Sequence, residues 1–88
     1  MDIAQTSAKQ HDEELEGFYE VIVPAVNVRK EAGISKKNAV VDTVMKTEIV
    51  ECDGTYAIDN EQASSSKWLH IMHNGISGFV KSSCVVKL

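Results

Sequence analysis

The hydrophobic pattern of the chain changes in kind near residue 17. Before this point, residues 4–16 contain no Pro or Gly. Side chains that would share one face of a helix recur at spacings of four, three, four and three: Ala4, Ala8, His11, Leu15 and Phe18. This periodicity predicts a helical or short heptad stripe with an acidic polar face, and Gly17 stands where such a helix would stop. A helix of this length is marginal alone in water. The segment is therefore interpreted as a frayed acidic arm or linker, a docked helix, or the end of a longer helical stalk.

Beyond this point the pattern is typical of β-strands. Residues 18–28 are rich in aromatic and β-branched side chains and are broken by Pro24. Two more short apolar runs follow at residues 40–44 and 49–52, separated by the connection 45–47. Three short strands in succession predict an all-β fold.

A longer irregular segment separates these strands from the last pair. Residues 54–67 contain Gly, Asp, Asn and three consecutive serines. This composition predicts a long hairpin excursion. Within it, residues 56–58 could extend the strand pair before the turn.

The clearest local signal is a β-hairpin near the C-terminal end. Residues 68–72 alternate in character, and residues 78–80 return as a strand. Between them, Asn74-Gly75 is the preferred pair for a tight type I′ turn. These residues together predict two antiparallel strands.

The alternation within this hairpin also predicts which face is buried. Leu69 and Ile71 share one face of the strand, while Trp68, His70 and Met72 share the other. Two aliphatic side chains suit a core better than an aromatic, an imidazole and a thioether. We therefore expect a buried Leu69 face and a partly exposed Trp68.

Charge is distributed unevenly along the 88 residues. The whole chain has 13 acidic and 9 basic side chains, a net charge of −4. Residues 1–20 hold six acids against one lysine, which gives −5, whereas residues 21–88 hold seven acids against eight bases, which gives +1. The body is nearly neutral and has no basic stripe, so we expect no nucleic-acid partner. The length allows one small domain, divided into an acidic arm (1–17) and a folded unit (18–88).

No membrane or export segment is recognised in the sequence. The longest uncharged, apolar-leaning run covers residues 21–28, eight residues against the roughly 20 that a membrane helix needs. The first residues include Asp2 and Lys9 but no apolar stretch of the kind that marks a secretory signal. We expect no membrane insertion, and either an intracellular protein or a fragment of a larger protein of the cell envelope.

Two cysteines, Cys52 and Cys84, are interpreted as reduced, buried small hydrophobic residues. A disulfide between them would require adjacent strands and an oxidising compartment. With His11, His70 and His73 they show no metal-ligand spacing. We therefore expect no metal site and no cofactor.

Two separated motifs stand out in the strand-like part of the chain. An opening strand, Val26-Asn27-Val28-Arg29, leads into the loop Ala32-Gly33-Ile34-Ser35. A closing series follows in the order Trp68 to Ile71, Asn74-Gly75, Gly78-Phe79-Val80 and Ser82-Ser83-Cys84-Val85. Together they resemble the opening strand and the closing signature of the bacterial SH3-like (SH3b) domain family. The resemblance covers the chain from Tyr19 to Leu88. It departs from the family pattern in three places: residues 30–33 replace a common Gly-Pro, Thr47 replaces a frequent turn Gly, and the segment 54–67 is long.

The resemblance implies a small SH3-like barrel of five to seven short strands. It also implies a non-catalytic binding module, which targets a parent hydrolase, phage or envelope protein to the peptides of cell-wall peptidoglycan. The alternative is an intracellular or phage-encoded adaptor that uses the same barrel to bind another protein. Recognition of proline-rich motifs ranks below both, because the chain has few aromatic residues to form a shelf.

Ligand binding in such a module would take place in a groove between loops, with aromatic walls and a few directed hydrogen bonds. The candidate ligand-binding residues are Tyr19, Asn27, Arg29, Trp68, His70 and Asn74.

Several of these candidates also have a structural interpretation. Trp68 could supply a flat wall for a peptide or cap the core. Asn27 lies in an apolar strand, where a buried amide must be hydrogen-bonded, and a structural network is favoured. Arg29 could pair with a ligand carboxylate or, the favoured reading, with Glu31 or Glu48.

His70 is interpreted first as a surface strand histidine and Asn74 as a turn residue. Catalysis is not expected, because a Cys84 thiol near His70 or His73 would need an oriented base and a substrate cleft. The carboxylates of residues 12–16 lie in the arm, where they would not be held for acid–base work.

Overall fold

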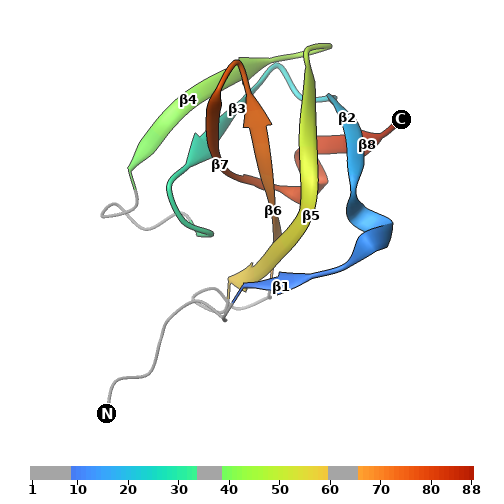
Figure 1. The fold of residues 1–88 in the computed structure, drawn as a ribbon. Helices are drawn as coiled ribbons and strands as arrows, with labels where there is room; N and C mark the ends of the chain where they lie inside the picture. Colours follow the sequence, from blue (N-terminus) through green and yellow to red (C-terminus); the bar gives the residue numbers. More distant parts are fainter. Residues whose placement is uncertain (1–8, 34–38, 60–65) are drawn as a thin grey trace.

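The computed structural model describes residues 9–33, 39–59 and 66–88. These residues form one antiparallel sheet of eight strands in the order β4-β3-β7-β6-β5-β2-β8, with β1 paired to β5, and they contain no α-helix (Figure 1). The strands are β1 Gln10–His11, β2 Gly17–Val21, β3 Ala25–Arg29, β4 Val40–Met45, β5 Ile49–Asp59, β6 Ser66–His73, β7 Ile76–Lys81 and β8 Val85–Lys87. Two 3₁₀ turns, η1 (Glu13–Leu15) and η2 (Ser82–Cys84), complete the described elements. The predicted all-β fold is confirmed.

The sheet curls on itself (Figure 1), and its inner face encloses the main hydrophobic core. Alternate side chains along each strand point inward, so every long strand contributes valine, leucine or isoleucine to this core. Its most deeply buried members are Val21, Val28, Val44, Val50, Leu69, Ile71 and Val80. The curl is held where the β4–β5 turn meets the β2–β3 connection. There the Thr47 backbone N–H donates to Val21 O at 2.9 Å, and that of Lys46 donates to Pro24 O at 3.1 Å. Between the described strands the ladder runs as an open path from β4 to β8.

The predicted β6–β7 hairpin is confirmed. Asn74 and Gly75 form its turn with φ of 52° and 83°, the left-handed conformation that a type I′ turn requires at both positions. Leu69 and Ile71 face the core, with 2% and 1% of their surface exposed.

The expectation that Trp68 is partly exposed is wrong. It lies on the opposite face of β6 from Leu69, yet only 3% of its surface is accessible. Trp68 belongs to a second, smaller cluster with Ala32, Ala57 and Phe79. Ala57 is its small neighbour across the strand pair, and Ala32 comes from the segment after β3. One end of the outer face is therefore covered, although the strand alternation alone suggested otherwise.

The helix expected at the N-terminal end does not form in residues 9–16, and residues 1–8 lie outside the described part. Instead, β1 pairs with β5 and η1 follows it, with Asp12 as the residue that caps η1. Leu15 packs against the main core, while Phe18, expected on the same stripe, is exposed. Pairing of β1 also explains why the sheet has eight strands, one more than the largest number expected.

The described parts of the long excursion expected at residues 54–67 belong to β5 and β6. After a bulge between Cys52 and Tyr56, β5 resumes its pairing with β6 and continues to Asp59↔Ser66. The extension expected at residues 56–58 is thus confirmed, and residues 60–65 lie outside the described part. Both cysteines are free thiols; Cys52 is buried in β5 and Cys84 is half-buried in η2. None of the described residues belongs to a helix with the length and apolar character that crossing a bilayer would require.

Candidate binding groove

Two adjoining hollows lie on the outer face of β5 and β6, at the end that the Trp68 cluster leaves open. The smaller, about 170 Å³, is lined by Glu51, Asp53, His70, Ile71 and Met72. The larger, about 570 Å³, extends from Phe18 and Ile49 to the β4–β5 and β6–β7 turns. Both hollows include Glu51 and Met72, so we treat them as one feature, the outer groove.

The middle of the outer groove is a row of three side chains on three neighbouring strands. Phe18 of β2 is the register partner of Glu51 of β5, which in turn is the partner of Met72 of β6. The residues after Phe18 and before Met72, Tyr19 and Ile71, point into the core. Strand alternation therefore directs the row outward. Phe18 and Met72 expose 55% and 51% of their surface, and Ile49, farther along the groove, exposes 44%.

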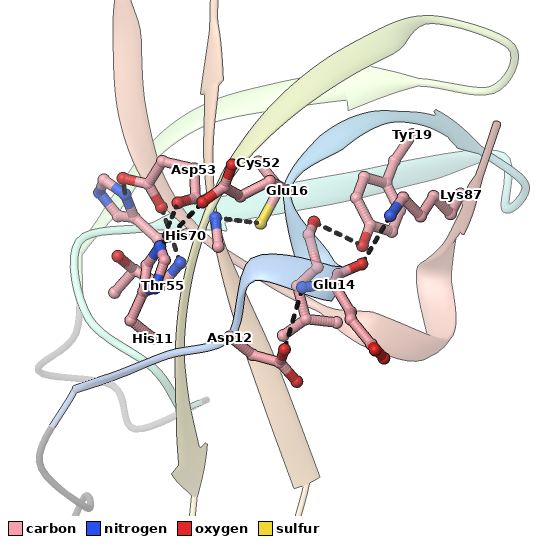
Figure 2. Close-up of polar contacts among 12 residues, drawn as sticks. His11, Asp12, Glu14, Glu16, Tyr19, Cys52, Asp53, Thr55, His70 and Lys87 are labelled. Atoms are coloured by element: carbon pink, nitrogen blue, oxygen red, sulfur yellow. Dashed lines mark hydrogen bonds and ion pairs between the residues drawn. The ribbon is translucent and has the colours of Figure 1, made fainter.

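One end of the outer groove carries an oriented imidazole. His70 Nδ1 lies 3.0 Å from Asp53 Oδ2 (Figure 2). The His70 ring also packs against Phe79, at a centroid distance of 5.0 Å. Partial burial of Asp53 opposes ionisation of its carboxyl group. Hydrogen bonds from the Thr55 backbone N–H and from His70 outweigh this effect and hold the pKa of Asp53 below its ordinary value.

The other end carries a histidine held between two carboxylates. His73 Nδ1 lies 3.0 Å from Asp42 Oδ2, and Nε2 lies 2.8 Å from Glu48 Oε1. Both ring nitrogens can donate only when the imidazole is protonated. The hydrogen bond to Asp42 raises the pKa of His73 despite its partial burial, and the same bond lowers the pKa of Asp42. This charged bridge links β6 to β4 and to the start of β5.

The N-terminal segment runs beside the outer groove and bonds to β5 (Figure 2). The Asp12 backbone N–H donates to Gly54 O at 2.9 Å. His11 Nε2 lies 3.2 Å from Asp53 O and 3.1 Å from Glu16 Oε2. Gly54 has φ of +89°, and a Cβ built there would lie only 2.7 Å from His11 Nε2. Only glycine allows the segment to approach β5 this closely.

The chemistry available in the outer groove is acidic and apolar. Glu48, Glu51 and Asp53 line it, and none of its described lining residues is Lys or Arg. The His70–Asp53 pair orients an imidazole, but the nearby thiol of Cys52 is buried, and burial raises its pKa. Among the described residues, no group of three or more His, Cys, Asp or Glu is arranged to hold a metal ion. The arrangement suits the binding of a group that is both cationic and apolar.

The structure brings two of the six expected site residues into the outer groove. His70 lines its smaller part and Asn74 its larger part, where Asn74 also forms the turn as expected. Tyr19 lies in the core and donates its hydroxyl proton to Leu15 O at 2.8 Å. Trp68 lies in the covered cluster and presents no open wall.

Asn27 and Arg29 lie on β3, away from the groove. The expectation of a buried Asn27 amide is wrong, because the side chain is exposed and its Oδ1 accepts from Thr43 Oγ1 at 3.2 Å. Arg29 is half-buried opposite Phe79 of β7. Glu31, one of the two acids suggested as its partners, pairs with Lys9 at 3.3 Å, and the other, Glu48, pairs with His73; the partner of Arg29 stays a prediction.

Sequence reasoning missed the central row of the groove, namely Phe18, Glu51 and Met72. The sequence offered one signal for Met72, since the alternation of the strand places it on the same face as His70. The register of β2 on β5 and of β5 on β6, which brings the three together, is set by contacts distant in the sequence. Comparison with protein-family models, with curated proteins and with solved structures finds no match to this chain.

Proposed function

We propose that this chain is a non-catalytic binding module that holds an extended peptide in the outer groove, and that the peptide belongs to cell-wall peptidoglycan. The observation that carries the binding role is the exposed row of Phe18, Glu51 and Met72 in a hollow on a sheet face. Exposed apolar side chains rimmed by polar residues in a hollow are a feature of interaction sites. The choice of peptidoglycan rests on the resemblance of the two sequence motifs to bacterial SH3-like domains, which is an argument from analogy.

A second candidate is an adaptor that binds another protein through the same groove. The observation in its favour is the apolar character of the exposed side chains, since Phe18, Ile49 and Met72 all expose more than two fifths of their surface. Aromatic residues and methionine are enriched in protein–protein interfaces relative to the rest of the surface. Both candidate functions use the same surface, so they are distinguished by which ligand binds and not by where it binds.

Sedimentation with purified peptidoglycan tests the proposal, with a matched pair of methionine variants. Met72 in the outer groove and Met45 on β4 expose 51% and 53% of their surface, so Met72→Gln and Met45→Gln should disturb the fold equally little. Loss of the partly buried contact of Met72 with a ligand should weaken binding about 3- to 10-fold. Met45→Gln should sediment like the unchanged protein.

Two results would count against the proposal in different ways. If the unchanged protein stays in the supernatant, the peptidoglycan ligand is lost and the adaptor candidate becomes the stronger one. If the protein sediments but the two methionine variants bind equally well, then peptidoglycan is bound elsewhere and the outer groove is not the site.

A further inference from the structure

Glu51 occupies a particular position in the outer groove. It lies between Phe18 and Met72 in the cross-strand row, and it is exposed. The other groove carboxylates are engaged: Asp53 with His70 and the Thr55 N–H, and Glu48 with His73. Within the part of the chain that the structure describes, no side chain forms an ion pair with Glu51. The row thus has a carboxylate that is open to a ligand at its centre and apolar surface on both sides.

This arrangement selects a definite ligand chemistry. Neighbouring strands lie about 4.8 Å apart, so Phe18 and Met72 are separated by roughly 10 Å, with Glu51 midway. A cationic group at the end of an aliphatic chain fits this row, because its methylene groups can cover Met72 or Phe18 while its charge meets Glu51. The ring of Phe18 can also attract a cation placed over its face.

We infer that the peptide held in the outer groove presents an aliphatic ammonium group, a lysine-like side chain or a free amino group, to Glu51. The inference rests on the proposed function, since it specifies what the bound peptide must carry. The same arrangement acts against anionic ligands: Glu48 and Asp53 are already engaged by His73 and His70, whereas Glu51 would oppose a carboxylate directly. None of the described lining residues is lysine or arginine.

Three six-carbon probes of different charge test the inference directly. Hexylammonium, 1-hexanol and hexanoate are titrated into ¹⁵N-labelled protein, and the backbone amide shifts of Phe18, Glu51 and Met72 are followed. Hexylammonium should shift these amides at lower concentration than hexanol, and hexanoate should be the weakest. Glu51→Gln should weaken hexylammonium about two- to five-fold, the range of an exposed ion pair, and leave hexanol unchanged. Added salt should reduce the advantage of hexylammonium.

Glu13→Gln is the matched control, because Glu13 is an exposed acid on η1 that does not line the groove. It changes the net charge by the same amount and should leave hexylammonium binding as it is.

The inference is overturned if hexylammonium and hexanol act alike, if the two glutamate variants act alike, or if the shifts lie outside the groove. If sedimentation with peptidoglycan depends on Met72 but not on Glu51, the proposed function stands and only the inferred contact between Glu51 and an ammonium group is refuted. If the protein does not sediment with peptidoglycan but hexylammonium binds as expected, the preference for an ammonium group stands and peptidoglycan is excluded as the ligand.

Discussion

Gly54 is a position at which a single methyl group should have a large local effect. It lies in the β5 bulge with φ of +89°, where the N-terminal segment crosses closest to the strand. A Cβ there would lie 2.7 Å from His11 Nε2, 2.8 Å from Glu16 Cγ and 3.0 Å from Asp12 O. Because one of these atoms is backbone, rotation of side chains alone cannot relieve the contacts. We expect Gly54→Ala to move the segment away from β5.

Gly75 provides a control with nearly the same φ angle. Its φ is +83°, but a Cβ there meets nothing within 4 Å. Gly75→Ala should therefore lower the free energy of unfolding only by the cost of placing an L-residue in the left-handed conformation, about 1–2 kcal/mol. The difference between the two alanine variants isolates the cost of displacing the segment.

The structure allows this additional cost to be worked out. Moving the segment breaks the hydrogen bond from the Asp12 N–H to Gly54 O, a loss of about 1 kcal/mol. It also withdraws Leu15, which is half-buried against the main core, for about 1 kcal/mol more. Gly54→Ala should thus be destabilised by about 3–4 kcal/mol in total, roughly twice the cost of Gly75→Ala.

Urea unfolding of the two variants and the unchanged protein measures these free energies on one scale. Amide shifts of His11 to Glu16 report separately whether the segment has left β5. If Gly54→Ala is no less stable than Gly75→Ala, and the shifts of the segment are unchanged, then the close approach at Gly54 does not hold the segment in place and the reasoning is refuted.

Three further predictions follow from buried or paired side chains. Trp68→Ala should lower the free energy of unfolding by about 3–5 kcal/mol, because the indole is buried in the small cluster, while Trp68→Phe should retain most of the stability in the same urea assay. The pKa of His73 is raised above its ordinary 6.5, so its bridge to Asp42 and Glu48 stabilises the fold fully below that pH and is lost as the pH rises through the raised pKa. Urea unfolding across this range should show a loss of stability that His73→Gln lacks; equal slopes for both proteins would contradict the bridge. Iodoacetamide should alkylate Cys84 in the folded protein but reach Cys52 only after unfolding, because Cys52 is buried and burial raises its thiol pKa. Peptide mass mapping distinguishes the two cysteines, and equal labelling would count against the buried thiol.

Local sequence signals predicted the parts of the fold that depend on neighbouring residues. The Asn74-Gly75 turn and the inward face of Leu69 and Ile71 both follow from residues within one hairpin, and the structure confirms them. Trp68 differs because its cover comes from a distant part of the chain, the segment after β3 that includes Ala32. Alternation shows which face a side chain occupies, but not whether that face is covered.

The N-terminal segment shows how a periodic pattern can arise without a helix. His11 and Leu15 lie four residues apart, as on a helix, but one belongs to β1 and the other to η1. Pairing with β5 outweighs the weak local preference of a short helix. The row of Phe18, Glu51 and Met72 could not be predicted from local sequence either, because it also depends on strand pairing. Phe18 and Met72 lie on different strands and are neighbours only of Glu51 on β5, which lies between them.

The pairing of β1 with β5 has a consequence for how the chain can be divided. Along one edge of β5, β2 covers Ile49 to Cys52, and β1 covers Thr55 and Tyr56. A fragment that began at residue 18, the boundary suggested by the sequence, would leave the second stretch with free backbone donors and acceptors. Such an open edge is a template for adding a strand from another molecule. Residues 10 and 11 therefore close this stretch of the β5 edge, and we expect a fragment without them to associate more readily than the longer chain.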